Sequence, residues 1–343
     1  MRTKAVVALI IVALGAAGLD GSPVRAQSVA EFYKDKSVAM IIGGSPGGGF
    51  DTLARAIARH IGKHIPGNPS VAPRNMQGAG GLAAMDHLYN IAAKDGSVIA
   101  LVGNTTPFVP LVTGKPARFD PLKMNWLGTP SIETTMVLVW NTVPVRTVED
   151  LKTRETTMGA SGVDSPQAFF GRLINTTLGT KMKIITGYQG QNEIFIAMER
   201  GEVDGFPSAP YSSITSTRPN WLRDGSARAV LQYGPEPLKE LPDVPWAPSL
   251  ITDPADQELM KLANAPNAIG RPLVMPPGVP ADRLAAMRKA LADTFTDREF
   301  IEEAAKIGLL VNAPRTGEQL YDVIRGAYAS VPSTIERLRK LER

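Results

Sequence analysis

The feature that most constrains this chain is a repeated unit of an apolar strand, a glycine-rich turn and an amphipathic helix. The first copy, IIGGSPGGGFDTLARAIARHI, spans residues 41–61, and its helical part places Leu53, Ala54, Ile57 and Ile61 on one face. Another copy follows in VAPRNMQGAGGLAAMDHLYNIAA, and later segments repeat the design without repeating the sequence. Strands that alternate with helices in this way predict α/β layers around parallel sheet.

The individual elements follow from this alternation. In the first part of the chain we expect a strand at 38–42, a helix at 51–64, a helix from about residue 81, and strands within DGSVIALVGN and TTMVLVWN. Thr147 is placed to cap the next helix. A second α/β run continues to ARAVLQYG, and the Pro-rich PEPLKELPDVPWAP predicts a surface connection. The segment NAIGRPLVMPPGVPADRLAAMRKALADTF predicts a final strand and a helix capped near Asp282.

Residues 1–26 have the pattern of a secretory signal peptide. Arg2 and Lys4 precede an apolar run at 5–14, and Val24-Arg25-Ala26 is similar to a cleavage site. The run is shorter than the ~20 residues that a membrane span needs. We therefore expect an exported, periplasmic mature protein of about residues 27–343.

The composition excludes several kinds of site. The chain of 343 residues contains no cysteine, which rules out disulfides, thiolate nucleophiles, iron–sulfur clusters and thiolate zinc sites. The formal net charge is only +4, and no basic run is interleaved with aromatic residues. We therefore expect no nucleic-acid partner.

The glycine turns match nucleotide-binding motifs poorly. No Gly-Lys-Ser or Gly-Lys-Thr follows a glycine loop, so the sequence contains no P-loop. The segment from Gly78 to Ala83 fits G-x-G-x-x-A, but its acidic partner, Asp95, lies in an Asp-Gly turn rather than at the end of a second strand. We therefore expect no nucleotide and no other cofactor.

An exported hydrolase is the alternative function. Gly43–Gly47 matches the G-x-S-x-G turn that presents a nucleophilic serine, here Ser45. Pro46, however, stands where the oxyanion hole needs an N–H group. The general base of this arrangement comes late in the chain, whereas all three histidines lie early: His60, His64 and His87. We therefore expect no catalytic residues and no enzyme activity.

A metal site is the other use that histidines suggest. His60 and His64 are four residues apart, a spacing that places two metal ligands on one helix face. The spacing indicates no third ligand, and histidines in a last helical turn also suit the helix dipole. We expect no metal site.

A simpler use of the glycine turns is to bind an anion. Backbone N–H groups at a helix N-terminus bind anions, and glycines let the ligand approach closely. The turns at Ser45–Asp51 and Asn75–Gly81 each follow a strand, so both fall at the carboxyl ends of strands and can converge on one ligand. Asp51 is expected mainly to cap its own helix and to pair with Arg55 at i+4.

At these turns the sequence resembles the extracytoplasmic solute receptors of tripartite tricarboxylate transporters, the Bug-type family. SPGGGFDTLAR matches the family's Pro-Gly-Gly-x-x-Asp-x-x-Ala-Arg turn, NMQGAGGLAA its Asn-x-x-Gly-Ala-Gly-Gly turn, and KDGSVIAL the strand that follows. Later matches, in order, are GASGVDS, GYQGQNEIFIAMERGEVDG, LPDVP and PPGVPADRLAAMRKAL. The resemblance spans nearly the whole mature chain.

The resemblance implies an α/β chain with the type II periplasmic-binding-protein fold, in which two domains joined by two crossover strands enclose a ligand cleft. It implies a monomeric periplasmic receptor that captures a small carboxylate and delivers it to the membrane permease subunits of its transporter. We expect a first domain at 27–138 and 273–343 and a second at 139–272, with the crossovers in MVLVWN and RPLVMP.

The expected ligand site combines both glycine turns with residues of the second domain. The resemblance implies that the turns hold one carboxylate through backbone N–H groups and that the second domain closes over the other end. The predicted ligand-binding residues are Ser45, Gly48, Gly49, Phe50, Asp51, Asn75, Gly78, Ala79, Asn104, Thr105, Ser161, Ser165 and Asp204.

Departures from the family pattern bear on the ligand. Gly44 stands where the family has an aromatic residue, and Phe50 stands where it has a small one. Phe50, with Tyr188 and Phe206 expected nearby, predicts an apolar or aromatic ligand body rather than a second carboxylate close to the first.

Overall fold

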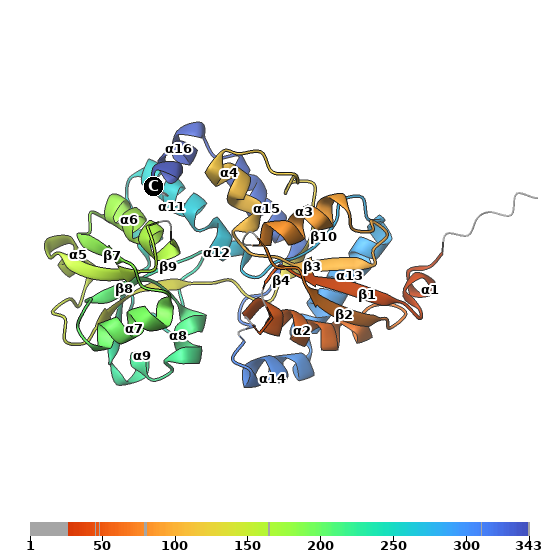
Figure 1. Ribbon diagram of the computed structural model, residues 1–343, viewed down its shortest axis with the longest axis horizontal. Coiled ribbons are helices and arrows are strands. Elements are labelled where there is room, and N and C mark those ends of the chain that lie inside the picture. Colours follow the sequence, from red (N-terminus) through yellow and green to blue (C-terminus); the bar gives the residue numbers. More distant parts are fainter. Residues whose placement is uncertain are drawn as a thin grey trace, which may run out of the picture.

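The computed structural model describes residues 27–44, 46–47, 49–78, 81–163, 165–309 and 311–341. These residues form two α/β halves, each built around one sheet (Figure 1). The predicted signal peptide and three predicted site residues, Ser45, Gly48 and Ala79, lie outside the described residues. Within the described ranges, no helix is both long enough and apolar enough to cross a membrane.

The first sheet is formed by β1 (Ser37–Ile42), β2 (Ser70–Asn75), β3 (Val98–Leu101), β4 (Asn125–Thr129), β10 (Leu273–Met275) and β11 (Arg315–Thr316). Their order across the sheet is β11-β4-β10-β3-β1-β2. β1 pairs in parallel with both β2 and β3, and Ile42 lies opposite Asn75 and Leu101. β10 runs antiparallel between β3 and β4. The carboxyl ends of β1, β2 and β3 therefore lie together, as the sequence predicts.

The second sheet is formed by β5 (Thr135–Trp140), β6 (Thr156–Ala160), β7 (Met182–Thr186), β8 (Gly205–Pro210) and β9 (Ala227–Tyr233). Their order is β7-β6-β8-β5-β9. β6 pairs in parallel with β7 and β8, whereas β5 runs antiparallel to β8 and β9. In this sheet β7, β6, β8 and β9 thus run in the same direction, and β5 runs against them between β8 and β9.

Helices cover both faces of the first sheet. α2 and α13 pack on one face with Leu53 and Leu291 in the core, and α3 and α15 pack on the other with Leu88 and Ile324. The helices before β5 and after β10 are α1 (Val29–Tyr33), α2 (Gly49–Ile61), α3 (Leu82–Asn90), α4 (Val109–Thr113), α13 (Ala281–Thr296), α14 (Arg298–Lys306), α15 (Gly317–Tyr328) and α16 (Pro332–Leu341), with short 3-10 turns η1 (Gly62–His64) and η3 (Thr106–Phe108).

The helices of the second half lie on its sheet in the same layered way. α6 packs against β8 and β7, and α7 against β6 and β8. The helices between β5 and β10 are α5 (Val148–Thr153), α6 (Pro166–Leu178), α7 (Gln191–Glu199), α8 (Tyr211–Thr217), α9 (Trp221–Asp224), α10 (Ala247–Leu250), α11 (Pro254–Ala263) and α12 (Ala265–Ile269).

The helical periodicity at the first glycine turn is confirmed in α2. Leu53, Ala54, Ile57 and Ile61 are each at most 1 % exposed and pack against strand residues of the first sheet. Burial of each of the larger side chains contributes about 1.5–3 kcal/mol. α2 ends at Ile61, three residues before the predicted end, because the chain tightens into η1.

The sequence patterns do not predict two of the elements correctly. β4 is only five residues long and contains Gly128 at φ +151°, so it lacks the apolar run that marks a strand. α12 occupies the beginning of the segment in which we expected a strand, and the strand itself, β10, starts only at Leu273. The capping prediction for Thr147 is confirmed, since its side chain and that of Asp150 form a capping box at the start of α5.

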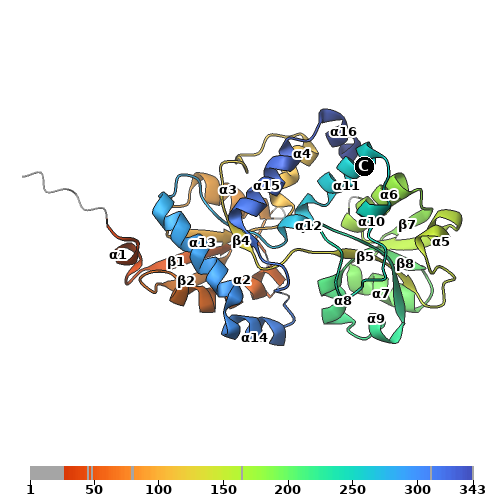
Figure 2. The same ribbon diagram turned by 180° about the vertical axis from the view of Figure 1, so that it is seen from behind.

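The chain passes between the two sheets twice, at 130–134 and at 270–272, and Figure 2 shows both connections near the middle of the molecule. β5 lies wholly in the second sheet, so the first passage comes before the expected boundary at residue 138. We retain two discontinuous domains as a proposal and place the first boundary near residue 134. α16, although it follows the last helix of the first half, packs against α11 and α6 of the second.

Candidate functional site

Two adjoining pockets of about 330 and 250 Å³ lie between the two halves, and we refer to them together as the cleft. Both are lined by the two passages between the sheets and by α8. Their shared lining residues are Ser131, Ile132, Glu133, Ser212, Ser213 and Arg271. The cleft therefore lies where a change in the angle between the halves would open or close it.

Arg271 supplies the positive charge of the cleft. It belongs to the second passage, and its backbone N–H donates to the Thr129 hydroxyl at 3.0 Å, which fixes the start of the side chain. Its Nη1 atom donates to the carbonyl oxygen of Gly49 at 3.3 Å, and its guanidinium carbon lies 5.7 Å from the centre of the Phe50 ring. Burial lowers the pKa of Arg271, and the carboxylate of Glu133 opposes that shift.

The start of α2 adds to the attraction for anions. Gly49 and Phe50, the first two residues of α2, line the cleft, so the positive end of the helix dipole lies beside Arg271. A side chain at residue 49 would meet this arginine, because a Cβ atom there would lie 3.5 Å from its Nη2 atom. The structure thus brings Gly49 and Phe50 to the cleft, as expected from sequence.

Glu133 places a carboxyl group on the same wall. Its Oε2 atom accepts a hydrogen bond from the Ser212 hydroxyl at 2.6 Å, and its backbone N–H donates to the carbonyl oxygen of Asn267 at 3.0 Å. Burial raises the pKa of Glu133, and the hydrogen bonds from Ser212 and the charge of Arg271 oppose this. An anion in the cleft would meet both this acidic group and the guanidinium.

Asp51 is used within the protein rather than at the cleft surface. Its carboxylate accepts hydrogen bonds from the Gly47 N–H, from Arg55 Nε and from Asn75 Nδ2, each at 2.9 Å. The Arg55 hydrogen bond is the largest cause that lowers its pKa to about 2. The i+4 ion pair with Arg55 is the one that the sequence indicates, whereas the backbone N–H that Asp51 binds belongs to Gly47, before α2, rather than to the first turn of the helix.

Asn75 joins the two glycine turns. Its Nδ2 atom donates to the carbonyl oxygen of Gly44 at 3.0 Å, and its Oδ1 atom accepts from Arg55 Nη2 at 2.9 Å. The amide is therefore fully engaged between the turns. Gly78 adopts φ +143°, which favours glycine, but it does not line the cleft. None of the described residues of the second turn lines the cleft.

Of the pair after β3, Asn104 lines the cleft, whereas Thr105 lines a neighbouring pocket. Ser161 and Ser165 serve the start of α6: the Ser161 hydroxyl bonds Gln167 at 3.2 Å, and Ser165 caps the helix by accepting from the Ala168 N–H. In their place, Pro166 and Phe170 of α6 line the cleft.

The placement expected for Asp204 is corrected by the structure. Asp204 comes immediately before β8, and its Oδ2 atom accepts from the N–H and the hydroxyl of Thr157 at 2.7 and 2.8 Å. The cleft instead contacts Ser208 and Pro210, at the other end of that strand. A strand of six residues spans about 20 Å, so Asp204 lies far from the ligand space. Phe206 is fully buried in the core against Phe195.

Sequence reasoning missed Arg271, Glu133 and the serines of α8. Arg271 stands in RPLVMP, a segment that the sequence indicates only as a crossover between the domains, and its position depends on Gly49, 222 residues away in the chain. The signal that could have identified Arg271 is a basic residue just before a predicted apolar strand. The serines of α8 follow β8 directly in PYSSITS, at the carboxyl end where ligands bind in α/β proteins.

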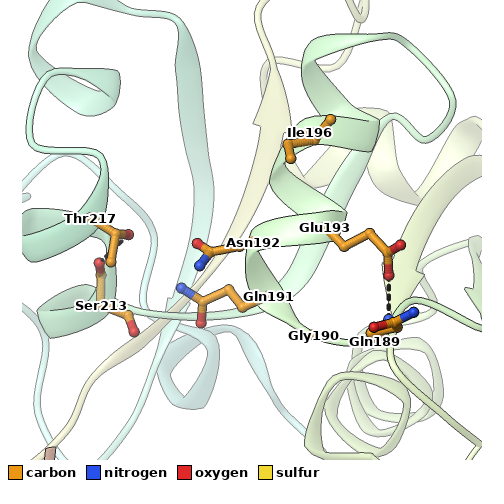
Figure 3. Close-up of a pocket in the computed structure, with 8 residues that line it drawn as sticks. All are labelled: Gln189, Gly190, Gln191, Asn192, Glu193, Ile196, Ser213 and Thr217. Atoms are coloured by element: carbon orange, nitrogen blue, oxygen red, sulfur yellow. Dashed lines mark hydrogen bonds between the residues drawn. The ribbon is translucent and has the colours of Figure 1, made fainter. Parts of the chain in front are cut away.

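A more open pocket lies on the second half alone (Figure 3). Gln191 and Asn192, at the start of α7, extend toward Ser213 and Thr217 of α8. Ser213 also lines the cleft, so this pocket continues the cleft along the second half. Its lining contains Glu193 and no arginine or lysine, so it is less suited to an anion than the cleft.

His60, in α2, and His64, in η1, form hydrogen bonds with carboxyl groups away from the cleft. His60 Nε2 lies 2.7 Å from Glu303, and His64 Nε2 lies 2.9 Å from Asp297. In the described ranges, His60, Asp297 and Glu299 are close enough to share a metal ion, but the Lys63 ammonium pairs with both carboxylates at 2.6 Å. The 13 residues of α2 place this network about 18 Å from the glycine turn.

The comparisons with known proteins show the fold. No family model matches the chain, and no curated protein matches it in sequence. Among solved structures it is similar to a TctC solute-binding protein from Polaromonas, at 17% identity over 90% of this chain and 98% of that one, with a TM-score of 0.70.

Two further structures support the same architecture. MatC from Rhodopseudomonas palustris, solved with bound malate, is 19% identical over 90% of this chain and 99% of its own, with a TM-score of 0.56. The periplasmic binding protein BugD is 19% identical over 90% of this chain and 98% of its own, also with a TM-score of 0.56. The chain therefore has the two-domain α/β fold of periplasmic binding proteins that the sequence predicts.

Proposed function

We propose that the protein is a Bug-type periplasmic receptor that captures a small organic carboxylate and delivers it to a tripartite tricarboxylate-type membrane transporter. It acts by binding and carries no catalytic residue. The G-x-S-x-G turn at Ser45 gains no support as a hydrolase site, since His60 and His64 lie at and beyond the far end of α2.

The observation that carries this proposal is the position of Arg271. Its guanidinium lines a cleft between the halves, next to the start of α2, and the described residues give it no ion pair. A guanidinium in such a place binds a carboxylate through charge-assisted hydrogen bonds, and the helix dipole adds to the attraction. Gly49, Phe50 and Asn104 complete the ligand site that we propose.

The structural neighbours support the same class of ligand. MatC shares the fold and holds malate, a small carboxylate. The neighbours named as solute-binding or periplasmic binding proteins support an exported receptor. Location in the periplasm, cleavage after about residue 26 and docking to permease subunits as a monomer belong to this proposal.

Ligand binding by the mature protein tests the proposal directly. Thermal shifts and titration calorimetry with butyrate, malate, adipate and benzoate should reveal stabilisation that grows with ligand concentration. Arg271→Met should weaken the best carboxylate about 10- to 100-fold, because it removes a charged hydrogen-bonding partner. Arg298→Met, on the exposed side of α14, is the matched control and should bind as the wild type does.

One result of the thermal-shift experiment would contradict the proposal. If no carboxylate stabilises the protein while an uncharged sugar or a phosphate ester does, the protein is not a carboxylate receptor. Docking is tested separately, because uptake of the bound carboxylate should disappear in a strain that lacks the permease subunits.

A further inference from the structure

A second cavity, which we call the hinge pocket, lies beside the cleft and has a volume of about 390 Å³. Its walls come from η3 and α4 of the first half, from α6, α11 and α12 of the second, and from α16. Figure 1 shows α4, α16, α11 and α12 gathered on one side of the passages between the sheets. The hinge pocket is therefore a second interdomain space, distinct from the open pocket of Figure 3.

The lining of the hinge pocket is apolar. Phe108, Leu111, Phe169, Leu262 and Leu338 face it and are each less than 10 % exposed. The remaining lining includes four polar but uncharged residues and no lysine, arginine, aspartate or glutamate. Such a cavity favours a hydrocarbon chain or ring and opposes a second charged group, whose desolvation no residue here would offset.

The hinge pocket adjoins the part of the cleft that contains Arg271. Both spaces are lined by Asn104, Pro166, Phe170 and Asn267. The two amides at this boundary are held in place, since Asn104 donates to the Pro266 carbonyl oxygen at 3.1 Å and Asn267 donates to Asn264 at 3.2 Å. A molecule with its anionic end at Arg271 would have its other end directed at the apolar space.

We propose that the cleft and the hinge pocket together bind an amphipathic monocarboxylate. Its carboxylate lies at Arg271 and the start of α2, and its aliphatic chain or aromatic ring passes Asn104 and Phe170 into the hinge pocket. This inference rests on the proposed carboxylate-binding function and narrows its substrate class. It also assigns the apolar ligand body to the hinge pocket rather than to Tyr188 and Phe206.

A homologous series of ligands tests this inference. Calorimetry with butyrate, hexanoate and octanoate should give affinities that rise about fourfold for each added CH₂ group, the gain expected for burial of a methylene. Hexanoate should bind at least about tenfold more tightly than adipate, which has the same length but a second carboxylate that would enter the apolar pocket. All of these acids should lose affinity in Arg271→Met.

A variant that fills the hinge pocket tests the location. Val112 lines the pocket and is only half-buried, packed beside the core rather than within it, so Val112→Phe enlarges a side chain at the pocket. It should lower octanoate affinity at least about tenfold and leave butyrate affinity unchanged, which also shows that the variant is folded. Val331→Phe, at a residue that is 58% exposed and outside the pocket, is the matched control.

The possible outcomes separate the two proposals. If malate and adipate bind through Arg271 and affinity does not rise from butyrate to octanoate, the carboxylate receptor stands and the amphipathic ligand is refuted. If affinity rises with chain length but Val112→Phe has no effect, the tail lies elsewhere and the hinge pocket is refuted. If no carboxylate binds, the proposed function itself fails.

Discussion

The carboxyl group of Glu133 and the hydroxyl of Ser212 are joined by a hydrogen bond of 2.6 Å, which fastens the first passage between the sheets to α8. The same carboxyl group lines the cleft together with the Arg271 guanidinium, and the charge of each affects the pKa of the other. The negative charge of Glu133 therefore competes with any carboxylate ligand for interaction with the Arg271 guanidinium.

We expect Glu133→Gln to strengthen carboxylate binding about 3- to 10-fold at neutral pH, since it removes a repulsive charge while keeping a hydrogen-bond acceptor for Ser212. Burial already raises the pKa of Glu133, and a bound anion would raise it further. Wild-type affinity should therefore increase, with proton uptake, as the pH falls from 7 toward about 5. Calorimetry in buffers of different ionisation enthalpy measures this uptake.

The control for this experiment is Glu302→Gln on α14, which changes the same charge away from the cleft. It should alter neither the affinity nor its pH dependence. Equal affinities for wild type and Glu133→Gln at every pH would contradict the competition between Glu133 and the ligand.

Asp51→Asn should destabilise the protein by about 1.5–3 kcal/mol at pH 7, because it removes the negative charge that pairs with Arg55 and replaces one of the two oxygens that accept from Arg55, Gly47 and Asn75 with an NH2 group. The folded-state pKa of Asp51 is lowered from its ordinary 3.8 to about 2. Its carboxylate therefore stabilises the fold fully above about pH 4 and progressively less as the pH falls toward 2. Urea unfolding at a series of pH values should show that the difference in unfolding free energy between wild type and variant decreases as the pH falls through that range.

Asp322→Asn provides the comparison for Asp51. Asp322 pairs with Arg325 on the exposed face of α15, with both side chains 63% exposed. Its replacement should change stability by less than about 0.5 kcal/mol. If the difference in unfolding free energy between wild type and Asp51→Asn stays constant down to pH 2, the charge of Asp51 does not stabilise the fold.

Gly270→Ala should be among the most damaging single substitutions in the chain. Gly270 begins the second passage with φ +57°, and a Cβ atom there would lie 1.8 Å from the carbonyl oxygen of Ser131 in the first passage. We expect a loss of at least about 3 kcal/mol, since both backbone strain and a steric overlap must be relieved. Gly225→Ala has a similar positive φ but open space, and should cost only about 1–2 kcal/mol. Denaturant unfolding of the two variants measures the difference.

Leu338→Ala should destabilise the protein by about 2–3 kcal/mol, because Leu338 is 3% exposed and anchors α16 over the hinge pocket. Leu250→Ala, at a residue that is 40% exposed, should cost less than about 0.5 kcal/mol. Thermal unfolding compares the two, and similar losses would mean that α16 does not contribute through its packing.

Local pattern was sufficient for much of the fold. The spacing of Leu53, Ile57 and Ile61 predicts α2 and its buried face, and Thr147 predicts the start of α5, since both depend on residues within one or two turns. β4 was not predicted from the sequence, because its few residues, which include Gly128, show no strand pattern. Its place in the sheet is set by pairing with β10.

The site was predictable only where it follows directly from the order of the strands. Gly49, Phe50 and Asn104 come after β1 and β3 and lie at the cleft as expected. Asp204 comes before its strand, so the same rule about carboxyl ends would have placed it away from the ligand. Arg271 depends on the pairing of distant segments, which no local spacing reveals.

The position of α16 has a mechanical consequence for the receptor function that we propose. α16 is tied to the first half through the short link after α15 and through the Arg339 guanidinium, which donates to the carbonyl oxygen of Leu111. It is tied to the second half by the Arg337–Asp256 ion pair and by Arg172, which donates to the carbonyl oxygen of Leu341. The molecule thus has a third tether besides the two passages between its sheets. Rotation of the halves must slide or release this tether, so it restricts the amplitude of opening and, with it, the rate at which a captured molecule escapes.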